Sequence, residues 1–130
     1  MTERIKLIQP TDAELEVLHI LWENGPSTVR FVNDRLNERK NVGYTTTLKI
    51  MQIMHEKGIL TRNKKDRTHI YTTVLEEDET QSLLVEKLLK IAFDGSASKL
   101  VMQTLGNRKT SKEELQKIKD LIEKIEKDQP

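Results

Sequence analysis

Cysteine is absent from this 130-residue chain. Without thiols, the protein can form neither disulfides nor thiolate metal sites, and it has no cysteine-based redox sensor. Long apolar runs are missing too: no stretch approaches the ~20 residues that cross a bilayer as a helix. The sequence shows no positively charged stretch followed by a short apolar stretch, the pattern of a secretory signal peptide. With 35% hydrophobic and 33% charged residues, the composition predicts a soluble cytoplasmic protein of one or two small domains.

Catalytic and metal-binding patterns are also scarce. The histidines His19, His55 and His69 have no His or Cys partner at ligand spacing, so we expect packed or surface side chains. The chain contains no glycine-rich phosphate loop and no nucleophile elbow. Glu76 and Glu77 are adjacent acids, but they stand at an expected helix start, where they favour the helix dipole. The sequence therefore predicts no enzyme, no metal and no cofactor.

Residues 43–58 predict one short helix with two different faces. Thr45 is expected as its N-cap, accepting from the first backbone N–H groups, and Gly58 as its left-handed C-terminal cap. The side chains on one face are apolar or small and recur at helical spacing, as packing against a core requires. The opposite face is free to contact a partner. The packing stripe contains Thr47, Ile50, Met51 and Met54, and the free face contains Thr46, Lys49, Gln52 and Ile53.

A hairpin is expected directly after this helix. Residues 59–64 and 68–74 alternate well enough for two strands, and the tip Lys65-Asp66-Arg67 is polar and basic. A helix followed by a basic hairpin is typical of a winged helix. The fold class predicted is therefore mainly α with a small β-wing, an N-terminal winged helix-turn-helix at 1–75 followed by a helical module at 76–130.

Two earlier helices complete the predicted N-terminal domain. Thr11 and Glu14 form a capping box that opens a helix over Asp12–Asn24, and Gly25-Pro26 ends it. A second helix is expected over about 28–38. Their core-facing residues are Leu15, Val17, Leu18, Leu21 and Trp22 in the first and Val29, Val32 and Leu36 in the second.

Positive charge is concentrated in the middle of the chain. The net charge is only +1, yet residues 39–75 carry an excess of +6, whereas 1–38 sum to −3 and 76–130 to −2. A basic segment over the third helix and the wing is the footprint that phosphate binding requires. The alternative is that the lysines simply decorate a solvated surface. The eight basic residues are Arg39, Lys40, Lys49, Lys57, Arg62, Lys64, Lys65 and Arg67.

These segments together resemble the penicillinase repressor family, the BlaI/MecI/CopY group of bacterial winged-helix repressors. The resemblance rests on Thr11-Asp-Ala-Glu-Leu-Glu-Val-Leu-His-Ile-Leu-Trp22, Ser27-Thr-Val-Arg30, Tyr44-Thr-Thr46 and Lys57-Gly-Ile-Leu60, followed by Asp66-Arg67 and Tyr71. It implies a homodimer on a palindromic operator that blocks transcription, with a β-lactam-resistance or related stress system as a candidate target. At the positions of Lys49, Ile53 and Asp66, the family often has Thr, Arg and Gly, respectively. The base preference and the turn of the wing are therefore expected to differ here.

Double-stranded DNA is thus the expected partner. Thr45, Thr46, Lys49 and Gln52 are the predicted groove contacts, since hydroxyls bond phosphates or base edges and Gln pairs with adenine. Tyr44 either touches a phosphate or packs beneath the helix. The predicted wing contacts, which position more than they specify, are Arg62, Lys64, Lys65 and Arg67. The runner-up hypothesis is a winged-helix module for protein contacts that does not bind specific DNA.

The last third of the chain predicts an assembly module. Three short helices with apolar stripes are expected, over residues 77–93, over 97–105 and after a cap formed by Ser111 and Glu114. The stripe of 77–93 is too wide for one small partner, and the three helices would be only marginally stable alone. A two-fold dimer would bury the stripes; the alternative is one monomeric core with the winged domain. The predicted dimer residues are Leu84, Leu88, Ile91, Leu100, Val101, Leu115, Ile118, Ile122 and Ile125.

The resemblance also implies a route for relief of repression. In the best-known members, a membrane sensor protease leads to a cut at an Asn-Phe pair in a helix resembling 99–105, and the positions here are Gln103 and Thr104. Neither side chain matches that pair. The mismatch argues against the same cut between Gln103 and Thr104. Relief by disruption of the dimer is expected, with proteolysis within residues 97–105 as one route. The copper-responsive branch carries paired C-terminal cysteines, which this chain lacks.

Overall fold

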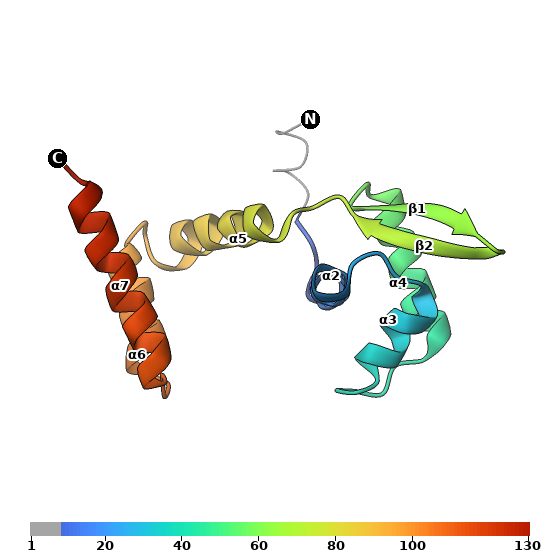
Figure 1. Cartoon of the computed structure of the whole chain (residues 1–130), viewed down its shortest axis with the longest axis horizontal. Helices are drawn as coiled ribbons and strands as arrows, with labels where there is room; N and C mark the ends of the chain where they lie inside the picture. Colours follow the sequence, from blue (N-terminus) through green and yellow to red (C-terminus); the bar gives the residue numbers. More distant parts are fainter. Residues whose placement is uncertain (1–8) are drawn as a thin grey trace. The chain divides into compact units, whose positions relative to one another are not determined.

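The computed structural model describes residues 9–130. The chain forms α2 (Asp12–Asn24), α3 (Val29–Leu36), α4 (Tyr44–Glu56), β1 (Leu60–Lys65), β2 (Thr68–Thr73), α5 (Glu77–Ala92), α6 (Ala97–Gly106) and α7 (Lys112–Asp128), coloured along the sequence in Figure 1. Its contacts divide it into two units, one ending at Leu84 and one from Val85 to Pro130. The predicted fold class, mainly α with a small β-wing, is confirmed.

Helix α2 begins and ends as its sequence predicts. The Thr11 hydroxyl accepts from the Glu14 N–H at 3.2 Å, and the Glu14 carboxylate accepts from the Thr11 N–H at 2.9 Å, so the capping box is complete. Gly25 ends the helix with a φ of +80°, a backbone conformation that residues other than glycine rarely adopt. The indole N–H of Trp22 donates to the Leu75 carbonyl at 3.0 Å, which ties α2 to the segment after the wing.

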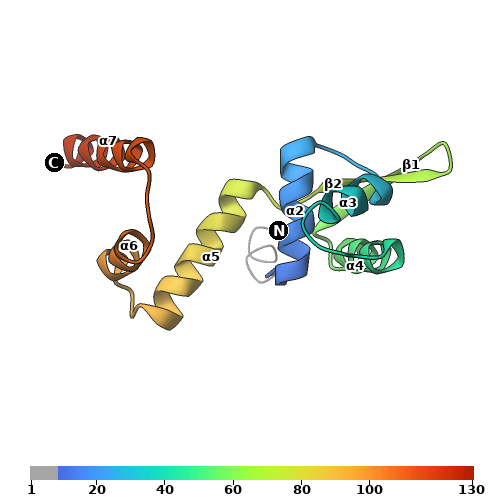
Figure 2. The same ribbon diagram turned by 90° about the horizontal axis from the view of Figure 1, so that it is seen from below.

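Helices α2, α3 and α4 enclose one apolar core with the base of the wing (Figure 2). Both upstream helices contribute the stripes that their periodicity predicts, and the strands add Leu60 and Tyr71. Leu15 and Trp22 pack at its edge. The buried apolar residues are Val17, Leu18, Leu21, Val29, Val32, Leu36, Met51, Met54, Ile59, Leu60, Tyr71 and Leu75.

The turn between α3 and α4 is held by two asparagines. Asn33, buried at 6% exposure, donates from Nδ2 to the Val42 carbonyl at 3.0 Å and to the Thr47 hydroxyl at 2.8 Å. Asn37 accepts from the Val42 N–H at 3.1 Å and donates to the Val42 carbonyl at 2.8 Å. Because buried polar groups are costly without partners, this network fixes how α4 leaves the turn. This network was not predicted from the sequence, although Asn33 interrupts the apolar stripe of α3.

The wing is an antiparallel hairpin that extends past the helices (Figure 1). Lys65 pairs with Thr68, so Asp66 and Arg67 alone make the turn, with φ of 50° and 68°. Two left-handed residues are the signature of a type I′ turn, which normally favours Asn and Gly. At the base, Ser27 and Tyr71 exchange backbone hydrogen bonds of 3.1 and 2.9 Å, which anchor the wing to the α2–α3 loop.

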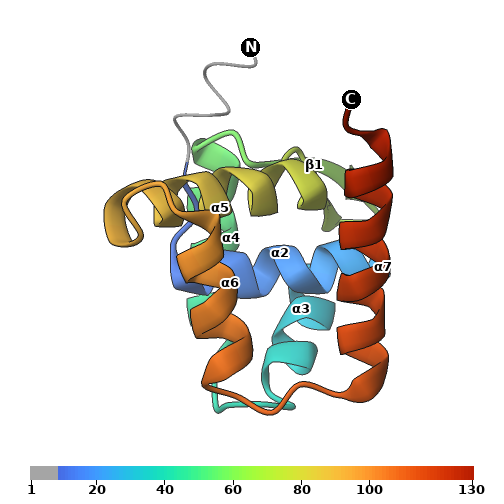
Figure 3. The same cartoon turned by 90° about the vertical axis from the view of Figure 1, so that its left-hand side faces the viewer.

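The C-terminal helices are amphipathic but bury almost nothing. Ser96 and Ser111 cap α6 and α7 through their hydroxyls, as Ser111 was predicted to do. Figure 3 shows α6 descending to the loop that joins the two helices and α7 rising from it, so that the two helices run roughly antiparallel. Among the described residues of α5, α6 and α7, Thr80 alone is buried. The apolar stripes of these helices are therefore available to a partner.

Candidate nucleic-acid interface

Helix α4 presents the two predicted faces. Thr47, Met51 and Met54 are fully buried, and Ile50 packs at the edge of the core. The four residues predicted to point the other way, Thr46, Lys49, Gln52 and Ile53, are all exposed. Thr45 is exposed beside them at the first turn. The core therefore fixes the rotation of α4 about its axis, and hydroxyl, ammonium and amide groups share its outer surface.

The predicted N-cap of this helix was wrong. Gly43, not Thr45, is the N-cap, and it offers no side-chain hydrogen bond to the first turn. Tyr44 is already helical, which places Thr45 inside the first turn rather than before it. The N–H groups of a first helical turn have no partner within the helix, and they and the helix dipole both attract anions. The predicted C-terminal cap is confirmed, because Gly58 is left-handed at φ +85° and its N–H donates to the His55 carbonyl.

The basic residues of the wing are all exposed. Arg62, Lys64 and Lys65 lie on β1, and Arg67 lies at the turn. Of the β1 residues, only Leu60 is buried, so the strand carries its charges on a surface that the core does not use. Exposed cations of this kind suit contacts with phosphates, which position a protein on a duplex without reading its bases.

Two of the eight predicted basic residues are already paired with acids on α2. The Lys57 ammonium lies 2.8 Å from Glu14, and the Lys40 ammonium lies 2.7 Å from Glu16. Burial acts to raise the pKa of Glu14, but hydrogen bonds from Lys57 and the Thr11 backbone outweigh it, so the pKa lies below its usual 4.5. The count of +6 therefore overstates the free charge, and the unpaired cations concentrate on α4 and the wing.

One cation outside the basic segment joins this surface. The Arg30 guanidinium, on the first turn of α3, lies over the Tyr44 ring at 4.8 Å from its centroid. Arg30 is exposed, and Tyr44 is 40% exposed, so the ring lies at the surface rather than beneath α4. Arg30 was not among the predicted contacts because it lies before the basic segment at residues 39–75. Its place in the Ser27-Thr-Val-Arg30 motif was the available signal.

The comparisons with known proteins agree with this geometry. The family model described as Penicillinase repressor matches residues 10–124. The chain belongs to the penicillinase repressor family. A transcriptional regulator BlaI of Mycobacterium tuberculosis is 33% identical over 93 residues, covering 70% of this chain and 67% of that protein. A penicillinase repressor of Bacillus licheniformis is 25% identical over 118 residues, covering 91% and 92%.

A solved structure supports the fold of this family member. A MarR family protein from Bacillus stearothermophilus superposes with a TM-score of 0.53, covering 97% of this chain and 79% of that one. At 17% identity the likeness concerns the winged-helix fold alone. The family is one of transcriptional repressors, which fits an exposed α4 face beside a basic wing.

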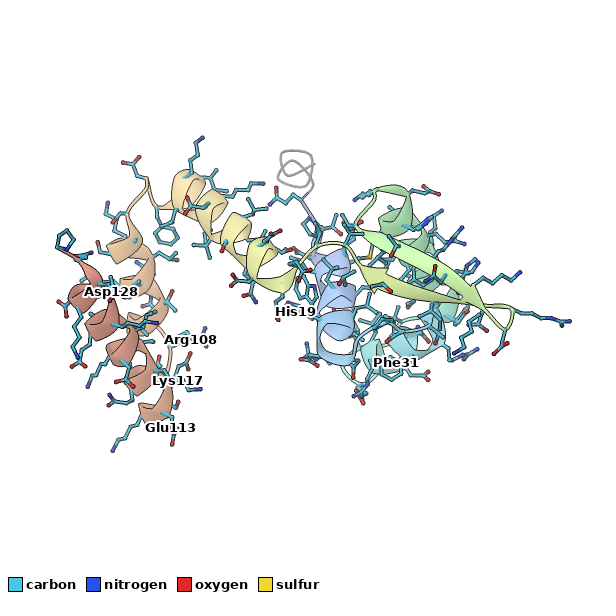
Figure 4. All side chains as sticks on the ribbon, turned by 45° about the horizontal axis from the view of Figure 1, so that its top comes forward. His19, Phe31, Arg108, Glu113, Lys117 and Asp128 are labelled. Atoms are coloured by element: carbon cyan, nitrogen blue, oxygen red, sulfur yellow. The ribbon has the colours of Figure 1, made fainter. Side chains whose placement is uncertain are left out.

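The predicted dimer residues of this repressor line the helices with unburied stripes. Ile91 is 69% exposed and Ile122 is 50% exposed. Leu88, Val101 and Ile125 are also exposed, whereas Leu84, Leu100, Leu115 and Ile118 are half-buried. Charged side chains occupy the other faces of α7, as Glu113, Lys117 and Asp128 illustrate in Figure 4. This separation of apolar and charged residues is what a helix needs to pack against another helix.

The predicted cleavage residues lie inside a formed helix. Gln103 and Thr104 are exposed on α6, and the Thr104 hydroxyl donates to the Leu100 carbonyl at 2.8 Å. The side chains are accessible, but the peptide bond between them is helical. A protease would therefore have to unwind this turn before it could cut.

Residues 9–130 contain neither a cluster of metal ligands nor a helix that could span a membrane. No three His, Cys, Asp or Glu side chains in that range gather as a metal site would require. His19 lies on α2, His55 on α4 and His69 on β2, each on a separate element as predicted. No helix of the described range is long and apolar enough to span a bilayer.

Proposed function

We propose that this chain is a repressor that binds double-stranded DNA as a homodimer, with α4 in the major groove and the wing on the flanking backbone. One observation carries the proposal: α4 is held by the core on one side and exposes Thr46, Lys49 and Gln52 on the other, beside a wing of unpaired cations. A major groove admits an α-helix, and its base edges carry a distinct pattern for each base pair. The family assignment supports a regulator of transcription.

The proposed contacts divide into two kinds. Thr45, Thr46, Lys49 and Gln52 lie on α4, and in this proposal they contact the groove. Arg62, Lys64, Lys65 and Arg67 lie on the wing and would neutralise phosphates. Contacts to base edges change affinity for one sequence, whereas contacts to phosphates change affinity for all sequences. The two kinds can therefore be separated by experiment.

The experiment measures binding of the full chain to a duplex selected by it and to a scrambled duplex, at several salt concentrations. Lys64→Ala should weaken binding to both DNAs alike and lower the slope of log affinity against log salt by about one. Thr46→Ala should weaken binding to the selected duplex alone. Equal losses on both DNAs for Thr46→Ala would remove this residue from the base-reading set.

The same assay separates DNA binding from the runner-up hypothesis. A winged-helix module that binds only proteins should not bind random duplex at low salt, whereas the cations of α4 and the wing should give measurable non-specific affinity. Such binding is electrostatic and weakens steeply as salt rises. Absence of binding at low salt would support the protein-binding module and contradict the proposal.

The dimer proposal is supported by the C-terminal helices. Exposed side chains such as Leu88, Ile91 and Ile122 leave apolar surface in contact with water. Apolar burial is worth roughly 25 cal/mol per Å², so a second copy offering the same stripes would stabilise these helices by covering them. A two-fold dimer would also match the two half-sites of a palindromic operator. Simultaneous binding of both half-sites raises affinity through an effective concentration on the order of millimolar.

We propose relief of repression by disruption of this dimer, in a β-lactam or related stress response. A cut between Gln103 and Thr104 by a sensor protease would remove α7 with Leu115, Ile118 and Ile122. The test follows an N-terminally tagged chain by immunoblot in bacterial cells exposed to a β-lactam. A fragment of about 100 residues, appearing with derepression, would support this route. Derepression with the chain intact would exclude proteolysis and favour a ligand or another partner.

A further inference from the structure

A cleft opens where the first turns of α3 and α4 meet the wing. Arg30 comes from α3, Tyr44 from α4, and Arg67, Thr68 and His69 from the wing. Its floor is apolar and includes Val29, Leu48 and Tyr71. The backbone bridge between Ser27 and Tyr71, together with the packing of α3 against α4 and β2, holds α3, α4 and the wing in place around the cleft. The cleft is therefore built by the core of the domain.

The charge of this cleft is of one sign. No residue that lines it, within the described part of the chain, is acidic, whereas Arg30 and Arg67 supply two guanidinium groups. A second hollow, between α2 and α3, gives the contrast. It contains Arg35 and Arg39, but Glu16, Glu23 and Glu38 surround them. An anion would meet competing carboxylates in the second hollow and none in the first.

The Arg30–Tyr44 pair gives the cleft a fixed cation. A guanidinium stacked on a phenol ring loses part of its freedom before a ligand arrives, so less entropy is lost on binding. The five N–H donors of the guanidinium remain available for a phosphate, because the ring face uses none of them. The Thr68 hydroxyl adds a donor of the kind that commonly contacts DNA backbones.

We propose that this cleft holds one sugar–phosphate unit of the DNA backbone, with Arg30 as its main phosphate ligand and Tyr44 as the residue that positions Arg30. The inference rests on the proposed DNA-binding function and adds a contact that lies outside the wing and the exposed face of α4. The apolar floor of Val29, Leu48 and Tyr71 accommodates the deoxyribose, and Arg67 closes the cleft from the wing.

The experiment uses the full chain, a duplex that it selects from a random pool, and salt-dependent binding. Arg30→Ala should weaken binding about tenfold at low salt and lower the salt slope by about one. Tyr44→Ala should produce a smaller loss, and Tyr44→Phe should restore wild-type binding because it keeps the ring. The matched control is Arg108→Ala, which removes an exposed arginine between α6 and α7 (Figure 4) and should leave the slope unchanged.

Phosphate ethylation interference locates the contact. The wild-type chain should show a phosphate in each half-site whose ethylation blocks binding, and Arg30→Ala should lose that interference while keeping the others. Thermal unfolding of each variant, compared with wild type, shows that it is folded. A slope and interference pattern for Arg30→Ala equal to those of wild type would overturn the inference. Failure of the wild-type chain to bind any duplex would instead refute the proposed function itself.

Discussion

Asn33 is predicted to be the most costly polar side chain to remove from the winged domain. In Asn33→Ala, both Nδ2 hydrogen bonds of the buried amide are lost, to the Val42 carbonyl and to the Thr47 hydroxyl. The acceptors keep other partners, because Asn37 still donates to Val42 and Thr47 still donates to the Gly43 carbonyl at 3.4 Å. Two hydrogen bonds at about 1 kcal/mol each, with a small void added, give a loss of about 2–3 kcal/mol.

The assay is equilibrium unfolding in urea, followed by far-ultraviolet circular dichroism. Thr47→Val removes the hydroxyl at nearly constant shape, and a double-mutant cycle with Asn33→Ala should give a coupling energy of about 1 kcal/mol. The control is Asn41→Ala, an exposed asparagine in the same turn, which should change stability by less than about 0.5 kcal/mol. An Asn33→Ala variant as stable as this control would refute the role of the network in fixing α4.

Three further predictions concern charge, backbone strain and assembly. Glu14→Gln keeps the capping box but removes the ion pair with Lys57. Because the pKa of Glu14 in the folded protein lies below 4.5, wild type should be more stable than the variant above pH 4.5. The difference in unfolding free energy between the two proteins should vanish as pH falls through the folded-state pKa. Arg67→Gly should raise the free energy of unfolding by up to about 1 kcal/mol, because the φ of 68° at this position suits glycine. The same variant should bind all duplexes more weakly, because it lacks a cation of the wing. A loss of stability would contradict the argument from backbone strain. If the chain is a dimer, as proposed, Leu88→Asp should sediment as a monomer because it places a charge in the apolar stripe. Lys90→Asp on the same helix should stay dimeric.

The helices and the wing could be predicted from sequence because their signals are local. The capping box at Thr11 and Glu14, the left-handed Gly58 and the alternation of the hairpin each depend on a few neighbouring residues. The division of α4 into a buried and an exposed face followed from its period alone. Periodicity is therefore sufficient for the parts of this interface that lie on one element.

The errors and omissions arose where partners are distant in sequence. Lys57 and Glu14 are 43 positions apart, so a charge count could not show that this lysine is already paired. The Arg30–Tyr44 stacking depends on how the turn brings α3 and α4 together. Thr45 was predicted as N-cap because hydroxyls favour that position, but Gly43 already takes the extended conformation there. Tertiary packing decided the ion pair and the stacking, whereas the N-cap error lies within one turn of the chain.

Footprinting of the full-length chain on the DNA upstream of its own gene tests the central claim most directly. A dimer with one α4 in each of two major grooves should protect two half-sites related by two-fold symmetry, with centres about 34–36 Å apart or a multiple of that distance. Thr46→Ala should lose this pattern at concentrations where wild type shows it. Absence of a bounded protected segment, or protection unchanged by Thr46→Ala, would contradict sequence-specific recognition through α4.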